Sequence, residues 1–316
     1  MADVPQTVCV ISNPGLRRTL RRTLNAVGSS VQFPATLANC ESDAAILFID
    51  QECRLNASVP DLLRVLGDHG QLVILGDSIE DDDVVSMLRN DTMNHVIADQ
   101  DKPDEVELVV TAVKLLNGDI YGLEKYLAWG VKIHEKEIFT YDDKRHALEA
   151  AVANAKEAGS RRYVLRRIES VTDELLMNAL YDAPAALDGL TPYEHVARRS
   201  GKTAHPDEAR ALLRYGCDGR YFAVSVEDRF GELKKQTILD HLLRARNEGG
   251  RPKLNNDRGA GLGLYFILSS VTRFIVNVTP QHRTEVLCLF DLRQRGREQS
   301  TCTRSLHIFT GNNLAA

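Results

Sequence analysis

The sequence lacks long hydrophobic runs, closely spaced cysteines and an excess of basic residues, and each absence argues against a class of protein. No apolar run approaches the ~18 residues of a membrane-spanning helix. The six cysteines include no Cys-x-x-Cys pair, so neither a zinc site nor a disulfide framework is indicated. A net charge of -5 argues against a nucleic-acid-binding protein that works by neutralising phosphates. Because the chain also starts without the basic and apolar stretch of a signal peptide, we expect it to be cytoplasmic.

The first half of the chain alternates short apolar runs with amphipathic stretches, which is the pattern of a βα repeat with a parallel sheet. With 316 residues the chain is long enough for this domain and a second one. Strands are predicted at 7–11, 30–33, 45–49, 71–75 and 95–98. Helices are predicted at 16–26, 59–67, 79–89 and 103–116. The pattern predicts a flavodoxin-like doubly wound α/β sheet, whose functional groups gather at the carboxyl ends of the strands.

Asp50 follows the third predicted strand, and Lys102-Pro103 follows the fifth. With this arrangement the domain resembles the receiver of response regulators, in which Asp50 would be the phosphoacceptor and Lys102 its partner. The acidic pair that this family carries after the first strand is absent, because Ile11-Ser12-Asn13 stands there. Since Mg²⁺ prefers carboxylate oxygens, which Ser and Asn replace poorly, we predict that residues 1–118 form a pseudo-receiver. Its expected role is to bind a partner or to dimerise, without phosphorylation.

Residues 119–144 are predicted to form a connector, either a hinge or a dimerisation element, because bends interrupt an otherwise helical pattern there. His134-Glu135 invites comparison with the phosphate-accepting pair of histidine kinases. The residues that follow do not continue that pattern, and too little chain separates His134 from Asn178 for the usual helical hairpin. We therefore interpret His134 as a surface histidine.

The second half carries several short polar and glycine-rich motifs. Glu174 and Asn178 are four residues apart in a helical pattern, so they share one helix face. Two alternating runs at 209–215 and 221–226 are joined through Asp218-Gly219, which is a hairpin signal, and Asp228 ends the second run. Glycines at alternate positions then lead directly into an apolar helix, as expected of a phosphate loop: Gly259, Gly261 and Gly263. Strands are predicted to follow at 275–279 and 284–292.

In this order the motifs over residues 145–293 resemble the Bergerat-fold ATP-binding domain shared by gyrase, histidine kinases and the anti-sigma serine kinases. The resemblance implies an α/β sandwich with a mixed sheet. Glu174 and Asn178 match the N box of this family, and Asp228 with Gly231 matches its first glycine box. The second glycine box corresponds to Gly259, Gly261 and Gly263, and the last short motif to Thr284.

The resemblance also implies roles for these residues. Asn178 would be a ligand of Mg²⁺ that bridges the phosphates of ATP, and Asp228 would accept a hydrogen bond from the adenine amino group. Glu174 would be the general base. The phosphates would be cradled by the backbone N–H groups of Gly261, Leu262, Gly263 and Leu264. Phe230 and Glu232 depart from the family, because they stand where the first glycine box normally has glycines.

We therefore expect a signalling protein that binds Mg-ATP and acts as an anti-sigma-type protein serine/threonine kinase, controlled through its receiver-like domain. One alternative is a scaffold whose partner binding depends on nucleotide but which has no catalysis. Another is a response regulator with an ATPase output, which requires phosphorylation of Asp50. The expected partners are a protein substrate resembling an anti-anti-sigma factor and a second copy of the chain. Residues 294–316 are predicted to be a C-terminal surface extension, in which 304–310 could add one last strand.

Overall fold

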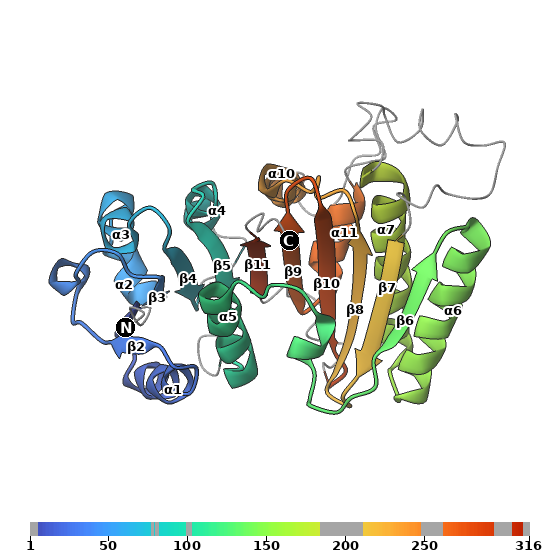
Figure 1. Ribbon diagram of the computed structural model, residues 1–316, viewed down its shortest axis with the longest axis horizontal. Coiled ribbons are helices and arrows are strands. Elements are labelled where there is room, and N and C mark those ends of the chain that lie inside the picture. The colour runs from blue at the N-terminus through green and yellow to red at the C-terminus, as the bar shows by residue number, and fades with distance from the viewer. Residues whose placement is uncertain are drawn as a thin grey trace. The chain divides into compact units, whose positions relative to one another are not determined.

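The computed structural model describes residues 6–76, 79, 82–98, 103–183, 211–247, 262–293 and 305–311. The chain divides into two compact units. One comprises Met1–Ile120 with Arg304–Phe309, and the other comprises Tyr121–Thr303 with Thr310–Ala316. Of the residues predicted to form a connector, 119 and 120 belong to the first unit, and 121–144, which include a strand and the start of a helix, belong to the second (Figure 1).

The first unit is built on five parallel strands, which the sequence predicted to within two residues. The strands are β1 (Gln6–Val10), β2 (Ser30–Gln32), β3 (Ile46–Asp50), β4 (Gln71–Leu75) and β5 (Met93–Ile97). They pair in the order β2-β1-β3-β4-β5, which is also the order of flavodoxin-like sheets. Every residue of β3 is buried, as expected for a central parallel strand that is covered on both faces.

The helices of the first unit are α1 (Pro14–Asn25), η1 (Leu37–Asn39), α2 (Gln51–Leu55), α3 (Val59–Leu66), α4 (Asp82–Leu88) and α5 (Glu105–Asn117). Four of them, α1, α2, α3 and α5, begin at side chains that cap them. The Asn13 side chain accepts hydrogen bonds from the first N–H groups of α1, and Pro14 occupies the first turn. Three leucines at helical spacing then bury this helix against Cys9 and Phe48: Leu16, Leu20 and Leu24.

A strand from the end of the chain completes the first unit. β11 (Ser305–Thr310) pairs antiparallel with β5, with His307 opposite His95. Leu306, His307 and Phe309 are each at most 1% exposed. The strand expected at 304–310 is therefore confirmed, but it is buried and does not form part of a surface extension. Burial of its apolar side chains against β5 removes them from water and so stabilises the strand in this position.

The second unit contains an antiparallel sheet. Its strands are β6 (His134–Ile138), β7 (Ala211–Cys217), β8 (Tyr221–Asp228), β9 (Arg273–Thr279) and β10 (Arg283–Asp291). They pair in the order β9-β10-β8-β7-β6. All the pairs among these described strands are antiparallel. Tight turns join β7 to β8 and β9 to β10, and a tight turn can join only antiparallel neighbours.

The helices of the second unit flank its sheet. They are η2 (Leu123–Tyr126), α6 (Tyr141–Glu157), α7 (Arg162–Met177), a π-helical turn (Asn178–Asp182), α10 (Lys235–Asn247) and α11 (Leu262–Ser270). α7 packs against β8, β10 and α11. Thr140 and Asp143 form a capping box at the start of α6. In Figure 1, α7 and α11 lie behind the sheet, whereas the segment that contains η2 passes in front of it.

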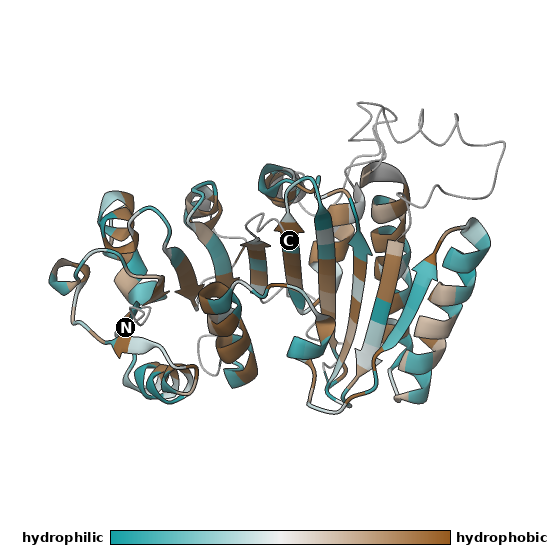
Figure 2. Ribbon diagram, in the orientation of Figure 1, coloured by the Kyte–Doolittle hydropathy of each residue, from teal (hydrophilic) through white to brown (hydrophobic). Residues whose placement is uncertain are grey.

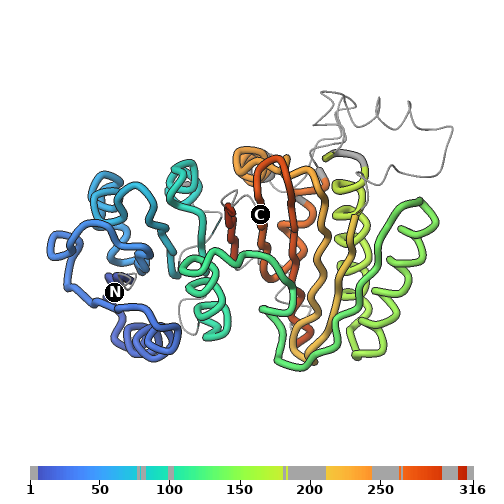
Figure 3. The backbone as a smooth tube through the Cα atoms, in the orientation of Figure 1, coloured from blue at the N-terminus to red at the C-terminus, as the bar shows by residue number. Residues whose placement is uncertain are grey.

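Hydropathy separates the interior strands from the edge strand of the second unit. Figure 2 shows β9 as mainly hydrophobic and β6 as mainly hydrophilic. The exposed residues of β6 are charged, which protects the free edge of the strand from pairing with other chains. His134 stacks on Tyr215 with a centroid distance of 5.1 Å. Figure 3 traces the backbone through the same strands and helices.

Candidate nucleotide site

Glu174 and Gly263 come from distant parts of the sequence and lie in contact in the second unit. Glu174 is on α7, and Gly263 is in the first turn of α11. A Cβ atom on residue 263 would lie 1.5 Å from Glu174 Oε1 and 2.2 Å from its Cδ. Any side chain at 263 would therefore overlap the carboxylate. The two predicted motifs that these residues represent are brought together by the packing of α7 against α11.

The surroundings of Glu174 raise the pKa of its carboxyl. Burial raises the pKa of this carboxyl, the nearby charge of Asp173 raises it further, and Lys144 lowers it. Lys144 is buried on α6, and its Nζ lies 2.6 Å from Asp173 Oδ1. Sequence reasoning missed Lys144, because no spacing in the sequence relates it to Glu174.

Asn178 lies at the point where α7 changes its winding. Its N–H donates to the carbonyl groups of Glu174 and Leu175, and the π-helical turn starts at this residue. Single π-helical turns occur frequently at functional sites. The half-buried Asn178 follows Glu174 by one helical turn, as predicted, and its amide oxygen is of the type that binds Mg²⁺.

Asp228 is a buried carboxylate at the end of β8. It is 7% exposed, and its Oδ1 accepts hydrogen bonds from the N–H groups of Phe230 at 2.8 Å and Gly231 at 3.3 Å. Burial raises the pKa of Asp228 to about 6, although these two hydrogen bonds lower it. A carboxylate held in this way can accept a hydrogen bond from a ligand while its own orientation stays fixed.

Thr284 faces Asp228 from the neighbouring strand. The two residues are direct partners in the β8–β10 register. The Thr284 hydroxyl is buried and has no hydrogen-bond partner of ordinary geometry within the described part of the chain, yet it lies close enough to lower the pKa of Asp228. A buried hydroxyl without a partner is rare in a native protein. Thr284 and Asp228 thus form a polar pair that could receive a ligand atom.

Gly231 is held against the turn between β9 and β10. Its φ of +67° lies in the left-handed region. A Cβ atom there would lie 2.3 Å from the carbonyl oxygen of Thr279 and 2.6 Å from the backbone nitrogen of Gln281. Only glycine fits this conformation and this contact. Gly231 therefore fixes the loop after Asp228 instead of leaving it free to close over a ligand.

Asp50 in the first unit is engaged in a different way. Its Oδ2 accepts hydrogen bonds from the N–H and hydroxyl of Ser12, each at 2.6 Å, and from the N–H of Asn13 at 3.2 Å. Its Oδ1 accepts one from the N–H of Cys53 at 3.0 Å and so caps α2. Although burial alone would raise the pKa of Asp50, these hydrogen bonds hold it below its usual value. Asp50 thus ties the first strand to α2.

Several predicted residues lie outside the described residues, namely Lys102, Gly259 and Gly261. Leu262 begins α11, and Leu264 is buried in the same helix. Among the residues that the structure describes, no group of three His, Cys, Asp or Glu side chains is arranged to hold a metal ion. In the same residues, no helix has the length and hydrophobicity needed to cross a membrane.

Comparisons with known proteins add little to this description. No family model and no curated protein sequence matches the chain. One solved structure that is similar to part of it is the crystal structure of the SiaB-SiaC complex from Pseudomonas aeruginosa. The match has 13% sequence identity and a TM-score of 0.32, and it covers 51% of this chain and 89% of the other.

Proposed function

We propose that the second unit binds Mg-ATP and that the protein is a signalling kinase that transfers phosphate to a serine or threonine of a protein partner. The observation that carries this proposal is the contact between the Glu174 carboxylate and Gly263 at the start of α11. A general base then lies beside a helix N-terminus, where backbone N–H groups favour phosphate. Asp228 and Thr284 add a polar pair on the neighbouring strand ends.

Each residue has a role that its surroundings support. Asn178 would offer its amide oxygen to the metal, and Asp228 would accept a hydrogen bond from the adenine amino group. Gly263 has no side chain that would displace the Glu174 carboxylate, and the Thr284 hydroxyl lies beside Asp228. Mg-ATP, when bound, would supply the phosphoryl group and the metal charge. Glu174 would accept the proton of the attacking hydroxyl, and its raised pKa favours this role.

The scaffold without catalysis remains the second candidate, and the loop after Asp228 favours it. Phe230 is buried where the related ATP-binding domains have a glycine. A bulky side chain there narrows the adenine end of the site. For the first unit we propose partner binding or dimerisation without phosphorylation, because both oxygens of Asp50 already accept hydrogen bonds.

Calorimetric titration of Mg-ATP into the full chain tests the binding site. We expect binding by the wild type and its loss in both Asn178→Ala and Asp228→Asn. Asn25→Ala and Asp68→Asn are matched controls, because both residues are exposed in the first unit. Absence of binding by the wild type at millimolar Mg-ATP, or equal binding by all five proteins, would sink the proposal.

Turnover separates the kinase from the scaffold. Phosphate release from Mg-ATP should be measured for the wild type and for Glu174→Gln, which keeps the shape of the side chain but cannot accept a proton. We expect Glu174→Gln to bind Mg-ATP normally and to lose turnover by a factor of about 10² or more. Binding without turnover in the wild type would favour the scaffold.

A further inference from the structure

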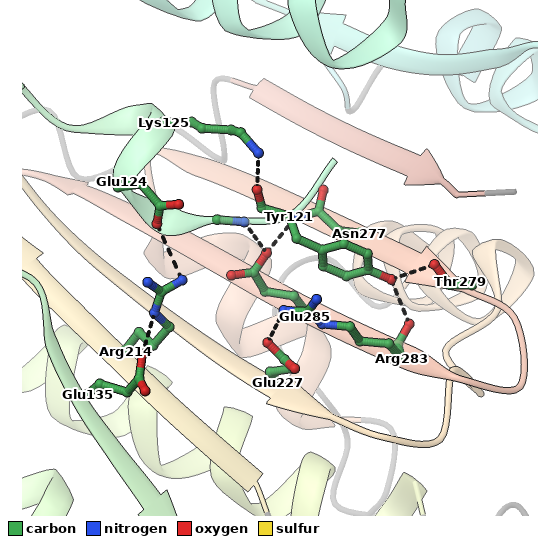
Figure 4. Close-up of polar contacts among 11 residues, drawn as sticks. Tyr121, Glu124, Lys125, Glu135, Arg214, Glu227, Asn277, Thr279, Arg283 and Glu285 are labelled. Atoms are coloured by element: carbon green, nitrogen blue, oxygen red, sulfur yellow. Dashed lines mark hydrogen bonds and ion pairs between the residues drawn. The ribbon is translucent and has the colours of Figure 1, made fainter. Parts of the chain in front are cut away.

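The face of the second-unit sheet that lies away from α7 and α11 carries buried polar residues. Side chains alternate along a strand, so Glu227 and Arg283 point toward this face, while their neighbours Asp228 and Thr284 point toward the helices. Figure 4 shows Glu227, Arg283 and Glu285 together on this side of the sheet. Glu227 and Arg283 therefore lie on the opposite face of the same strand ends that carry Asp228 and Thr284.

Residues 121–126, here called the crossing segment, lie over this face and begin with Tyr121. The Tyr121 hydroxyl lies 2.8 Å from Thr279 Oγ1 and 3.1 Å from the carbonyl oxygen of Arg283, within hydrogen-bonding distance of both. The guanidinium of Arg283 lies 3.9 Å from the centroid of the tyrosine ring. The same guanidinium forms an ion pair with Glu227 at 2.5 Å.

The crossing segment is fixed by further contacts with the sheet. The N–H of Gly122 donates to Glu285 Oε2 at 3.1 Å, and Asn277 donates to the same oxygen at 2.8 Å. Arg214 forms ion pairs with Glu124 at 3.3 Å and with Glu135 at 3.1 Å. These contacts reach β6, β7, β9 and β10 (Figure 4), so the position of Tyr121 is determined by the sheet as a whole.

Tyr121 is connected to Asp228 through the turn between β9 and β10. Thr279 and Arg283 are the residues on either side of this turn, and Tyr121 contacts both. The other side of the turn packs on Gly231, where the Thr279 carbonyl oxygen occupies the space that a side chain would need. The N–H of Gly231 in turn donates to Asp228 Oδ1. A continuous series of contacts therefore runs from the tyrosine hydroxyl to the carboxylate.

We infer that Tyr121 is a positioning residue for the adenine end of the site. This inference rests on the proposed function. The hydroxyl holds the β9–β10 turn in place, the turn holds Gly231, and Gly231 sets the orientation in which Asp228 meets the base. Loss of the hydroxyl should therefore impair recognition of adenine and leave the phosphate end unchanged.

Tyr121→Phe is the decisive variant, because it removes only the hydroxyl and keeps the ring that Arg283 covers. We expect the dissociation constants of Mg-ATP, Mg-ADP and adenosine to rise by the same factor, about 5- to 10-fold. The preference for ATP over GTP should fall by a similar factor, which a general loss of stability would not cause. Tyr141→Phe is the matched control, because Tyr141 is exposed on α6 and should change neither quantity.

Hydrogen exchange of the nucleotide-free protein tests the same inference independently of ATP. In Tyr121→Phe the amides of Phe230 and Gly231 should exchange at least about 5-fold faster, while the amides of α6 stay unchanged. Unchanged exchange at these two amides would overturn the inference, as would unchanged preference for ATP over GTP in a protein that binds ATP. Faster exchange in a protein that does not bind Mg-ATP would leave the mechanical link standing and refute the proposed function instead.

Discussion

Asp228 makes the stability of the second unit depend on pH. Its pKa is about 6 in the folded protein, against a usual value of 3.8, because burial disfavours the ionised form. A raised pKa means that this carboxyl stabilises the fold fully only below pH ~4, where it is protonated in both states. The contribution is lost as the pH rises through about 6. At about 1.4 kcal/mol per pKa unit, the ionised group destabilises the fold by roughly 3 kcal/mol at neutral pH.

Asp228→Asn should therefore stabilise the protein while it abolishes nucleotide binding. The amide oxygen of asparagine can still accept the N–H groups of Phe230 and Gly231, and it carries no charge. In urea unfolding followed by circular dichroism, we expect the variant to exceed the wild type by about 1–3 kcal/mol at pH 7.5. The difference should vanish near pH 4. A difference that grows as the pH falls would contradict this account, and Asp68→Asn should show no such dependence.

Gly263 and Glu174 should be energetically coupled. An added methyl group at 263 overlaps the Glu174 carboxylate, so Gly263→Ala should destabilise the wild type by about 1–3 kcal/mol. In a Glu174→Ala background the same change should have a much smaller effect, because the overlapping atoms are gone. Urea unfolding of the four proteins gives the coupling energy, which we expect to be at least about 1 kcal/mol. Additive effects would show that the two residues do not touch.

At the scale of elements, β11 is anchored in the first unit by a buried polar cluster. His307 Nε2 lies 3.1 Å from Glu107 Oε1, and His307 Nδ1 lies 3.3 Å from His95 Nδ1. Lys114 Nζ lies 3.9 Å from the centroid of Phe309. Because an Nδ1 to Nδ1 hydrogen bond holds one proton, one of the two imidazoles must be protonated at Nδ1 and the other must not. The contact forms in the register that places His307 opposite His95.

His307→Ala should loosen β11 and destabilise the first unit. It removes the contacts of the imidazole with Glu107 and His95 and leaves a cavity beside the buried Glu107, which should lower the free energy of unfolding by about 2–4 kcal/mol. Hydrogen exchange should accelerate at the amides of β5 and β11. His69→Ala is the control, because His69 is exposed in a turn. If the amides of β5 exchange at the wild-type rate in His307→Ala, the polar cluster does not anchor β11.

At the scale of the whole molecule, the two units should respond differently to nucleotide. A ligand that binds only the folded second unit stabilises it by RT ln(1 + [L]/Kd), which is about 2.7 kcal/mol at a hundredfold excess over Kd. With Mg-ATP, we expect slower hydrogen exchange in 211–247 and 262–293 and unchanged exchange in 6–76. Asn178→Ala should abolish the effect. Protection that appears mainly in 6–76 would contradict the assignment of the site to the second unit.

The junction between the units gives Tyr121 a further significance. It is the first residue of the second unit, directly after Ile120 at the end of the main segment of the first. The chain that leaves the first unit therefore enters the second at the residue that we assign to the adenine end of the site.

By itself, the sequence determined the elements and the motifs that depend on near neighbours. The alternation of short apolar runs with amphipathic stretches predicted β1 to β5. The four-residue spacing of Glu174 and Asn178 predicted that both share one helix face, because this spacing follows from backbone geometry. Only the tertiary structure decided the contacts between distant segments. These include β11 on β5, Lys144 beside Asp173, and Tyr121 against Thr279. No local pattern encodes such pairs, because they form only when whole elements pack and exclude water together.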